Sequence, residues 1–277
     1  MRIKLFYILT LIFIICETVN AKDYEYEIIK VDYKNLIANL YLPKTTSKVP
    51  VVIAIGGSEG GISTGNSNGE MIAPYGVAVL GLAYFKEKGI PDTLDHIPLE
   101  YFKDAIDFLE KTHAIDASRI GFVGGSRGAE LALLLASKEP RIKSVVATTP
   151  SSVAWYGRTT SQSAWTLNGK DIPALSLELD DKSPLLRRFE VALKNKVNVQ
   201  KAFFSFEKIN GPILLISAEN DQVWPSYQMS KDIVLYLEEH NFNYSVEHNS
   251  YATGHGFSGE TAPEIKKSII DHFVRTL

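Results

Sequence analysis

Residues 120–133 read IGFVGGSRGAELAL, and this stretch is the most informative part of the chain. Its first four residues form an apolar run of the kind found in buried strands, and residues 129–136 have the alanine- and leucine-rich composition of a central helix. Between them, GGSRG at 124–128 leaves room only for a tight strand-to-helix turn. Such a turn holds Ser126 in a strained backbone conformation, while the flanking glycines let the strand and the helix pass closely.

The alternative is a glycine-rich turn with an incidental serine. At average composition such a pentapeptide occurs by chance in on the order of one chain in ten of this length. Its position argues against chance, because it follows a predicted buried strand, lies near the middle of the chain and leads into a helix that is able to pack centrally. We therefore predict Ser126 as a nucleophile whose hydroxyl stands exposed above a sheet.

The sequence on both sides of this turn repeats a strand–helix texture. From Pro50 onward, fully apolar runs alternate with amphipathic helices, which is typical of a parallel sheet covered on both faces. Alternating patterns at 24–29 and 36–42 predict an antiparallel hairpin ahead of that sheet. The expected strands are 51–55, 77–83, 120–123, 144–148, 213–217 and 244–249, and the expected helices are 99–113, 127–137, 226–239 and one that begins at 263.

This pattern predicts an α/β fold of the α/β-hydrolase type, with a mostly parallel central sheet and helices on both faces. One segment interrupts the rhythm: residues 151–210 are polar and aromatic, with no clear strand before Gly211. We expect this 151–210 segment to be a lid or cap insertion above the strand ends, within a single domain that spans residues 22–277. Its Trp155 and Tyr156, together with Trp224, are candidates for an acyl pocket, although aromatic residues are more often simply packed.

A serine nucleophile needs a histidine to accept its proton and a carboxylate to hold that histidine, and in this fold their order along the chain is serine, acid, histidine. Asp221 follows the predicted strand 213–217 in a loop, where the acid of such a fold is placed. Glu219 in the same loop is a rival, and Asp180 or Asp181 are weaker ones. We predict Asp221 as the acid.

The base is predicted to be His255. It lies in Gly254-His255-Gly256, after the last predicted strand and before the C-terminal helix, on a loop that allows the imidazole to reach the serine. The other five histidines lie in less suitable places: His248 beside a strand, His272 within the final helix, and His96, His113 and His240 outside the expected order.

The loop after the strand 51–55 reads GGSEGG at 56–61 and is predicted to supply one donor for an oxyanion. Glycines allow backbone N–H groups to face an anion. We assign the oxyanion hole to the N–H groups of Ser58 and Arg127, with Gly57 or Glu59 as alternatives to Ser58. The loop lacks the lysine and the spacing of nucleotide-binding loops, so phosphate or cofactor binding is a weak alternative.

The composition is that of an ordinary soluble globular protein, with 45% hydrophobic and 22% charged residues among 277. A formal net charge of -3 without any basic run argues against nucleic acid or anionic lipid as a partner. There is no HExxH pair, and the one cysteine is Cys16, so no metal site and no cofactor are predicted. The expected partner is a small-molecule acyl ester or thioester.

The N-terminus is predicted to direct export. Arg2 and Lys4 precede an apolar run that is too short to span a bilayer comfortably, and small residues at Val19 and Ala21 suit cleavage after Ala21. A buried first helix or an uncleaved anchor is the alternative. Residues 1–21 are therefore expected to be a signal peptide, giving a periplasmic or secreted protein without stable membrane insertion and without disulfides.

Several stretches resemble one known family, the catalytic domain of acyl-CoA thioesterases and bile acid-CoA:amino acid N-acyltransferase. They are residues 57–61, 101–109, 120–133, 211–217 and 221–229, the last including Val223-Trp224-Pro225-Ser226 and Met229. The resemblance extends from about residue 50 to the C-terminus. It implies triad roles for Ser126, Asp221 and His255. In this family the acyltransferase members use a cysteine nucleophile and serine accompanies thioester hydrolysis, so Ser126 implies transfer of the acyl group to water.

The resemblance thus implies an acyl-CoA thioesterase-like serine hydrolase that acts through an acyl-serine intermediate. Residues 115–121 (IDASRIG) are also similar to dienelactone hydrolases and peptidases, which keeps an extracytoplasmic carboxylesterase or a dienelactone-hydrolase-like or peptidase-like hydrolase open as an alternative. A hydrolase fold used only for binding is a third hypothesis. It is disfavoured because all three triad candidates are present.

Overall fold

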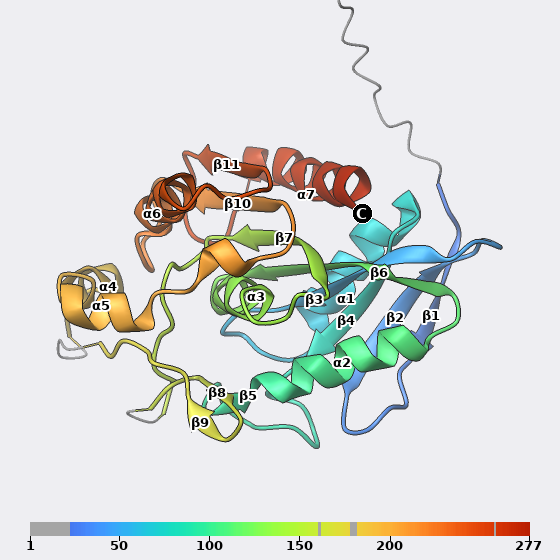
Figure 1. The fold of residues 1–277 in the computed structure, drawn as a ribbon, viewed down its shortest axis with the longest axis horizontal. Helices are drawn as coiled ribbons and strands as arrows, with labels where there is room; N and C mark the ends of the chain where they lie inside the picture. Colours follow the sequence, from blue (N-terminus) through green and yellow to red (C-terminus); the bar gives the residue numbers. More distant parts are fainter. Residues whose placement is uncertain (1–22, 160–161, 178–181, 258) are drawn as a thin grey trace, which may run out of the picture.

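The computed structural model describes residues 23–159, 162–177, 182–257 and 259–277. Eight strands form one sheet in the order β1-β2-β4-β3-β6-β7-β10-β11 (Figure 1). Their bounds are β1 (Tyr26–Lys30), β2 (Ile37–Pro43), β3 (Val49–Ile55), β4 (Ala78–Ala83), β6 (Ile115–Gly125), β7 (Ile142–Thr148), β10 (Ile213–Ala218) and β11 (Val246–Tyr251). β2 pairs antiparallel with β1 and β4, and every later pair is parallel, so the predicted sheet and its entry hairpin are confirmed.

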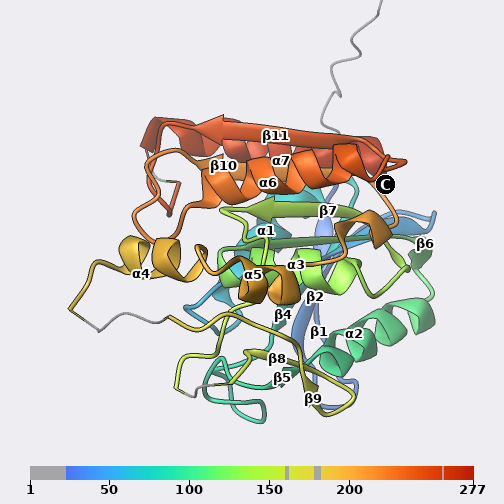
Figure 2. The same ribbon diagram turned by 60° about the vertical axis from the view of Figure 1, so that its left-hand side comes forward.

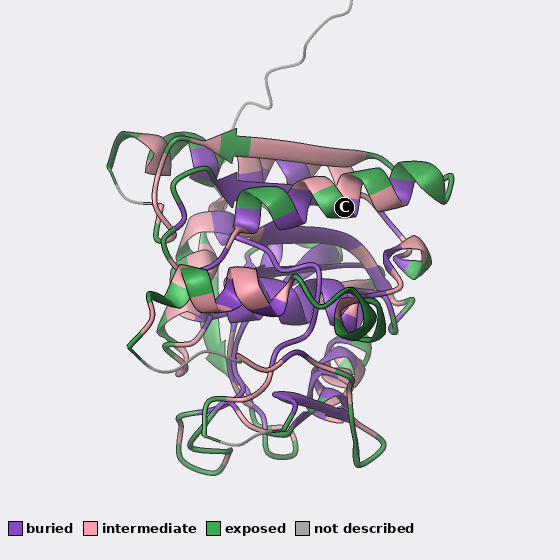
Figure 3. Cartoon of the chain, turned by 90° about the vertical axis from the view of Figure 1, so that its left-hand side faces the viewer, coloured by how far each residue is buried: buried purple, intermediate pink, exposed green. Residues whose placement is uncertain are grey.

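The central strands are apolar because both of their faces are covered. In β3, Val51, Ile53 and Ile55 face one hydrophobic core while Val52 and Ala54 face another, and all five are fully buried. The buried ribbon in Figure 3 is accordingly concentrated in the strands of this sheet. A strand with two covered faces loses the apolar–polar alternation of a half-exposed strand, which is why these strands are apolar throughout.

Helices cover the two faces of the sheet. α2 (Leu99–Lys111), α3 (Arg127–Ala136) and α6 (Ser226–Glu239) contribute to the core on one face, and α1 (Ser63–Ile72) and α7 (Ala262–Thr276) contribute to the core on the other. All ten residues of α3 are buried, as its alanine- and leucine-rich sequence predicts for a central helix. Short 3-10 helices lie at Ala73–Tyr75, Phe206–Lys208 and Gly259–Thr261.

Helix α1 was not predicted, because its sequence STGNSNGEMI has almost no apolar periodicity. It packs through glycine instead. A side chain at Gly65 would lie 2.8 Å from the Ala54 carbonyl oxygen of β3, and one at Gly69 would lie 2.3 Å from the ring of Tyr41 in β2. A helix that approaches a sheet through its backbone leaves no hydrophobic signal in the sequence.

The 151–210 segment connects β7 to β10 and holds α4 (Leu185–Ala192) and α5 (Lys196–Ala202). The prediction that it contains no strand is wrong: β8 (Trp165–Leu167) pairs with β5 (Ile97–Pro98) and with β9 (Lys170–Asp171) in a separate small sheet. Strands of two or three residues are too short to show an alternating pattern. In Figures 1 and 2, α4 lies beyond the arrowheads of β7 and β11, at the carboxyl end of the parallel strands.

Within the described residues, no helix is both long and apolar enough to cross a membrane. Residues 1–21, the predicted signal peptide, lie outside the described part of the chain, as do Asp180 and Asp181.

Candidate active site

Ser126 occupies the turn between β6 and α3, with φ 54° and ψ −120°. The strained backbone predicted from the sequence is therefore confirmed, since a residue other than glycine rarely adopts a positive φ. The N–H of Ser126 donates to the Thr148 carbonyl oxygen at 2.9 Å, which fixes the turn to the end of β7.

The glycines of the GGSRG turn permit close backbone contacts. A Cβ on Gly124 would lie 2.2 Å from the Gly128 carbonyl oxygen, and a Cβ on Gly128 would lie 2.4 Å from the Gly56 carbonyl oxygen. Strand β6, helix α3 and the loop after β3 thus meet at distances that exclude any side chain at these two positions. This contact places the 56–61 loop directly beside Ser126.

Ser126, His255 and Asp221 form one hydrogen-bonded chain. The Nε2 atom of His255 lies 2.8 Å from the Ser126 Oγ atom, and its Nδ1 atom lies 2.9 Å from each carboxylate oxygen of Asp221. The three residues follow β6, β10 and β11, whose carboxyl ends lie at one edge of the sheet. The parallel topology therefore brings together side chains that are 34 to 129 positions apart in the sequence.

The Asp221 carboxylate is held from several sides. It accepts hydrogen bonds from the N–H groups of Val223 at 2.9 Å and Trp224 at 3.2 Å, and from the Ser226 hydroxyl at 2.6 Å. Its side chain is only 2% exposed. Ser226 was quoted in the sequence as part of the family resemblance, but nothing in its position as the first residue of α6 indicated a bond to Asp221.

The imidazole of His255 is oriented by its surroundings. The Trp224 ring packs against it with 5.7 Å between ring centroids at an interplanar angle of 76°. The backbone N–H of His255 donates to the Gln222 Oε1 atom at 3.3 Å. Trp224 itself is 1% exposed, and its indole N–H donates to the Thr149 carbonyl oxygen at 3.1 Å. One of the three aromatic pocket candidates is thus both packed and adjacent to the imidazole.

The rival residues have other partners. The Glu219 carboxylate accepts a hydrogen bond from the Ser250 hydroxyl, and His248 lies 2.7 Å from the Ser217 Oγ atom. His96 contacts Asp171, and His240 contacts the Tyr236 carbonyl oxygen. His272 is buried in α7, and His113 is exposed.

The two residues predicted to donate to an oxyanion line the same cavity. Ser58 and Arg127 both line the cavity beside Ser126, and the N–H of neither donates to a residue that the structure describes. The N–H of Gly57, an alternative donor, is already bonded to the Glu59 Oε1 atom at 2.9 Å. The buried Tyr84 hydroxyl also donates to the Gly56 carbonyl oxygen at 3.1 Å, so the loop is fixed from beneath.

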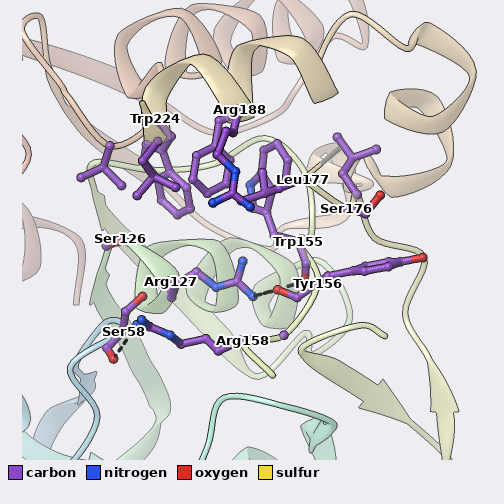
Figure 4. Close-up of a pocket in the computed structure, with 15 residues that line it drawn as sticks. Ser58, Ser126, Arg127, Trp155, Tyr156, Arg158, Ser176, Leu177, Arg188 and Trp224 are labelled. Atoms are coloured by element: carbon purple, nitrogen blue, oxygen red, sulfur yellow. Dashed lines mark hydrogen bonds between the residues drawn. The ribbon is translucent and has the colours of Figure 1, made fainter. Parts of the chain in front are cut away.

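A cavity of about 430 Å³ opens above Ser126, between the 56–61 loop and the 151–210 segment (Figure 4). Its apolar wall consists of Trp155, Leu175, Leu177, Leu185, Phe189, Val223 and Trp224. Its polar lining is Ser58, Ser126, Arg127, Tyr156, Gly157, Arg158, Ser176 and Arg188. This cavity is large enough for a small organic substrate and is apolar along one side.

A buried ion pair ties this cavity to helix α3. Arg127 Nη1 lies 2.9 Å from Glu130 Oε2, and the two side chains are 8% and 0% exposed. Glu130 Oε1 accepts hydrogen bonds from the Trp165 indole N–H at 2.6 Å and the Trp155 backbone N–H at 3.0 Å. Burial raises the pKa of Glu130, and Arg127 opposes that rise. Sequence reasoning missed Glu130 as part of the site.

In the part of the chain that the structure describes, no group of three metal-ligating side chains is close enough to hold an ion. The arrangement places a serine hydroxyl, an imidazole, a carboxylate and the predicted N–H donors beside a cavity. Those are the groups required for acyl transfer to and from a serine.

The chain matches the family model described as "BAAT / Acyl-CoA thioester hydrolase C terminal" over residues 97–270. The chain belongs to this family. The predicted resemblance is therefore confirmed, and the matched region contains Ser126, Asp221 and His255.

Curated relatives of this BAAT/thioester hydrolase domain include acyl-coenzyme A amino acid N-acyltransferase 2 of Mus musculus. It is 32% identical over 209 residues, which are 73% of this chain and 47% of the relative. Mitochondrial acyl-coenzyme A thioesterase 2 of Rattus norvegicus is 30% identical over 207 residues, which are 73% of this chain and 44% of the relative. The chain thus spans about half the length of the curated relatives it matches.

Comparison with solved structures shows that this chain has the α/β-hydrolase fold. A puromycin-hydrolyzing peptidase of Mycobacterium tuberculosis aligns with a TM-score of 0.64 and 15% identity, over 93% of this chain and 40% of that one. A Klebsiella pneumoniae protein assigned as a dienelactone hydrolase aligns with a TM-score of 0.59 and 14% identity, over 91% and 98% of the two chains. At these identities the likeness concerns the fold alone.

Proposed function

We propose that this protein is a serine hydrolase that cleaves acyl thioesters or carboxylic esters through an acyl-Ser126 intermediate. The observation that carries the proposal is the unbroken chain of hydrogen bonds from Asp221 through His255 to the Ser126 hydroxyl. Geometry of this kind lets a histidine accept the serine proton while a carboxylate holds its tautomer.

In the first half of the reaction, the Ser126 Oγ atom attacks the carbonyl carbon of the substrate, and its proton passes to His255 Nε2. The carbonyl oxygen becomes an anion that the N–H groups of Ser58 and Arg127 bind. The tetrahedral intermediate collapses as His255 returns the proton to the departing sulfur or oxygen atom. The products of this half are the acyl-Ser126 ester and a thiol or alcohol.

In the second half, a water molecule attacks the acyl carbon and gives a proton to His255 Nε2. The second tetrahedral intermediate is held by the same two N–H groups. Its collapse breaks the bond to Ser126 Oγ, which takes the proton back from His255, and a carboxylic acid is released. The Asp221 carboxylate stabilises the imidazolium that forms in each half.

The apolar wall of the cavity is suited to the acyl chain. Trp155 is 2% exposed, so it is part of a packed surface rather than a mobile flap. Its ring contacts Phe189 of α4 edge to face, with 4.5 Å between centroids, and Phe189 contacts Trp224 in the same way at 5.5 Å. Three aromatic rings thus pack against one another beside Ser126 and form an apolar surface that an acyl chain can contact.

Names among the relatives favour a thioester as the bond that is cleaved. Mitochondrial acyl-coenzyme A thioesterase 2 is one of them, whereas acyl-coenzyme A amino acid N-acyltransferase 2 is named for transfer to an amine. Serine as the nucleophile supports transfer to water. An oxygen-ester hydrolase of the carboxylesterase or dienelactone-hydrolase type is the second candidate, because the same site geometry serves either leaving group.

The decisive experiment compares the purified protein with Ser126→Ala on matched acyl-CoA, p-nitrophenyl ester and peptide-amide substrates. We expect kcat/KM to fall about 10,000-fold or more in the variant, as removal of a triad nucleophile does elsewhere. Ser47→Ala, an exposed serine remote from the cavity lining, serves as the control and should keep full activity.

If Ser126→Ala retains activity on every substrate that the protein cleaves, the nucleophile assignment is wrong. Preference for acyl-CoA supports the thioesterase, and ester activity without acyl-CoA activity supports the carboxylesterase. Failure of the unmodified protein to react with a fluorophosphonate probe would instead support a binding role.

A further inference from the structure

The charged residues that line the cavity above Ser126 are all arginines in the described part of the chain. Arginines 127, 158 and 188 line it, and no described lining residue is an aspartate or a glutamate. The whole chain has a formal net charge of -3. In Figure 4 the side chains of Arg127 and Arg188 approach the cavity from opposite sides, and Arg158 extends toward Ser58.

Arg127 is occupied by the protein itself. Its guanidinium pairs with the buried Glu130 carboxylate and donates to the Trp155 and Tyr156 carbonyl oxygens, both at 3.2 Å. The charge of Arg127 is therefore compensated by Glu130, and its guanidinium serves to hold the 151–210 segment. The Arg127 guanidinium is therefore already bonded within the protein and is not the group that we expect to bind a ligand.

Arg158 differs from Arg127 in its surroundings. It is exposed, and its Nη1 atom contacts the Ser58 carbonyl oxygen at 3.5 Å, at the limit of a hydrogen bond. No carboxylate among the described residues forms an ion pair with it. By contrast, four other arginines each pair with a carboxylate: Arg119, Arg141, Arg187 and Arg275.

The position of Arg158 is as informative as its charge. Ser58, which it contacts, also supplies the proposed oxyanion donor, so the guanidinium lies within one residue of the point where the carbonyl oxygen of a substrate is expected. A guanidinium offers two parallel N–H donors that match a carboxylate or a phosphate. At the mouth of a cavity with an apolar wall, such a contact is less screened than one on open surface.

We propose that the acyl chain of the substrate carries a carboxylate, which Arg158 binds near the reacting carbonyl. This inference rests on the proposed function and makes Arg158 a residue that determines specificity. The phosphates of a coenzyme A leaving group are separated from the thioester by the whole pantetheine arm, so an acyl-chain carboxylate fits this position better. One set of matched thioesters tests the two sources.

Three thioesters provide the comparison. S-hexanoyl-pantetheine is neutral, S-adipoyl-pantetheine places a carboxylate on the acyl chain, and S-hexanoyl-CoA places phosphates on the leaving group. Thiol release by the full chain is measured for the unmodified protein, Arg158→Gln and Arg158→Lys. Arg187→Gln is the control. Arg187 lies on helix α4 near the cavity, but it pairs with Glu190 and is not one of the lining residues.

We expect the unmodified protein to prefer S-adipoyl-pantetheine over the neutral thioester. Arg158→Gln should lower kcat/KM for that substrate about tenfold, mainly through KM, because a charge-assisted hydrogen bond is lost. Hydrolysis of S-hexanoyl-pantetheine should stay within about twofold, Arg158→Lys should retain most of the preference, and Arg187→Gln should change nothing. Preference for S-hexanoyl-CoA alone would assign the anion to the leaving group and overturn the inference.

The inference is also overturned if S-adipoyl-pantetheine is not preferred over the neutral thioester, or if Arg158→Gln lowers kcat/KM equally for all three. Both results leave the proposed function intact, because neutral thioester hydrolysis that depends on Ser126 would still be observed. If no thioester is cleaved, mono-p-nitrophenyl adipate and p-nitrophenyl hexanoate give the same acyl-chain comparison for an oxygen-ester hydrolase, and equal rates on that pair overturn the inference as well.

Discussion

Replacement of Glu130 by glutamine tests how strongly the buried ion pair stabilises the protein. Glu130 is fully buried, and its two oxygens face different partners: Oε2 lies 2.9 Å from Arg127 Nη1, while Oε1 accepts from Trp165 and Trp155. A glutamine in the same rotamer keeps an oxygen toward the two tryptophan donors. Its NH2 group then faces the Arg127 guanidinium, so two donors meet and the arginine charge loses its counterion.

The magnitude follows from the burial of both groups. Removal of one partner from a buried ion pair costs about 3–5 kcal/mol, because the remaining charge is left uncompensated. For a chain of this size, each kcal/mol shifts the melting temperature by about 2–4 °C, so we expect a decrease of roughly 10 °C. Activity should also fall, since the Arg127 guanidinium holds the Trp155 and Tyr156 carbonyl oxygens at the cavity wall.

Thermal unfolding followed by circular dichroism measures the effect. The matched control is Glu190→Gln, which removes a carboxylate from an exposed pair with 3.6 Å between Arg187 and Glu190, and it should change stability by no more than about 1 kcal/mol. If Glu130→Gln melts within about 2 °C of the unmodified protein, the buried pair does not stabilise the fold as reasoned here. Arg127→Met combined with Glu130→Gln should recover part of the stability, because no buried charge remains and the glutamine oxygen still accepts from both tryptophan donors.

Two further changes test other parts of the site and of the core. Ser226→Ala removes the 2.6 Å hydrogen bond to Asp221, and kcat should fall about tenfold because the carboxylate is less firmly placed. The control is Ser230→Ala, which removes a buried hydroxyl of the same helix that has no described partner, and it should leave kcat unchanged. Equal effects of the two substitutions would refute the positioning role of Ser226. Burial lowers the pKa of His272 from 6.5 to about 4, so the unfolded chain binds a proton more readily and stability should fall as the pH drops from about 6.5 toward 4. At about 1.4 kcal/mol per pH unit, His272 contributes about 3 kcal/mol to that loss of unfolding free energy. Urea unfolding at pH 7 and pH 4 should therefore show a smaller loss of stability in His272→Leu than in the unmodified protein. An unchanged pH dependence would contradict the role of His272.

The central sheet could be predicted because its strands carry a strong local signal. β3, β6 and β10 are buried on both faces and therefore apolar throughout, and the GGSRG turn marks one strand-to-helix junction. The strand 120–123 was predicted too short, because β6 begins at Ile115 and its first residues, DASR at 116–119, are polar and precede a register shift against β7. Helix α1 was missed because two of its three buried residues are glycines, so it shows almost no apolar periodicity.

The position of the three triad candidates could be predicted because topology alone brings them together. Residues that follow parallel strands β6, β10 and β11 end at one edge of the sheet, whatever the intervening sequence is. The roles of Glu130 and Arg158 could not be predicted in this way. Arg127 and Glu130 are three residues apart on a helix, and in a sequence that spacing indicates a solvent-exposed ion pair. The pair is buried among residues distant in sequence, including Trp155 and Trp165, which both donate to Glu130.

This packing links the 151–210 segment to the neighbourhood of Ser126 through Arg127. The Arg127 backbone N–H is the proposed oxyanion donor, while its guanidinium binds two carbonyl oxygens of the 151–210 segment. Glu130 holds the same segment at the Trp155 N–H and the Trp165 indole. A change that moves Trp155 relative to α3 must therefore strain the first turn of that helix, and with it the donor beside Ser126. Substrate range is consequently expected to vary through side chains such as Arg158, which lies beyond these anchors, more readily than through displacement of the backbone at residues 155 and 156.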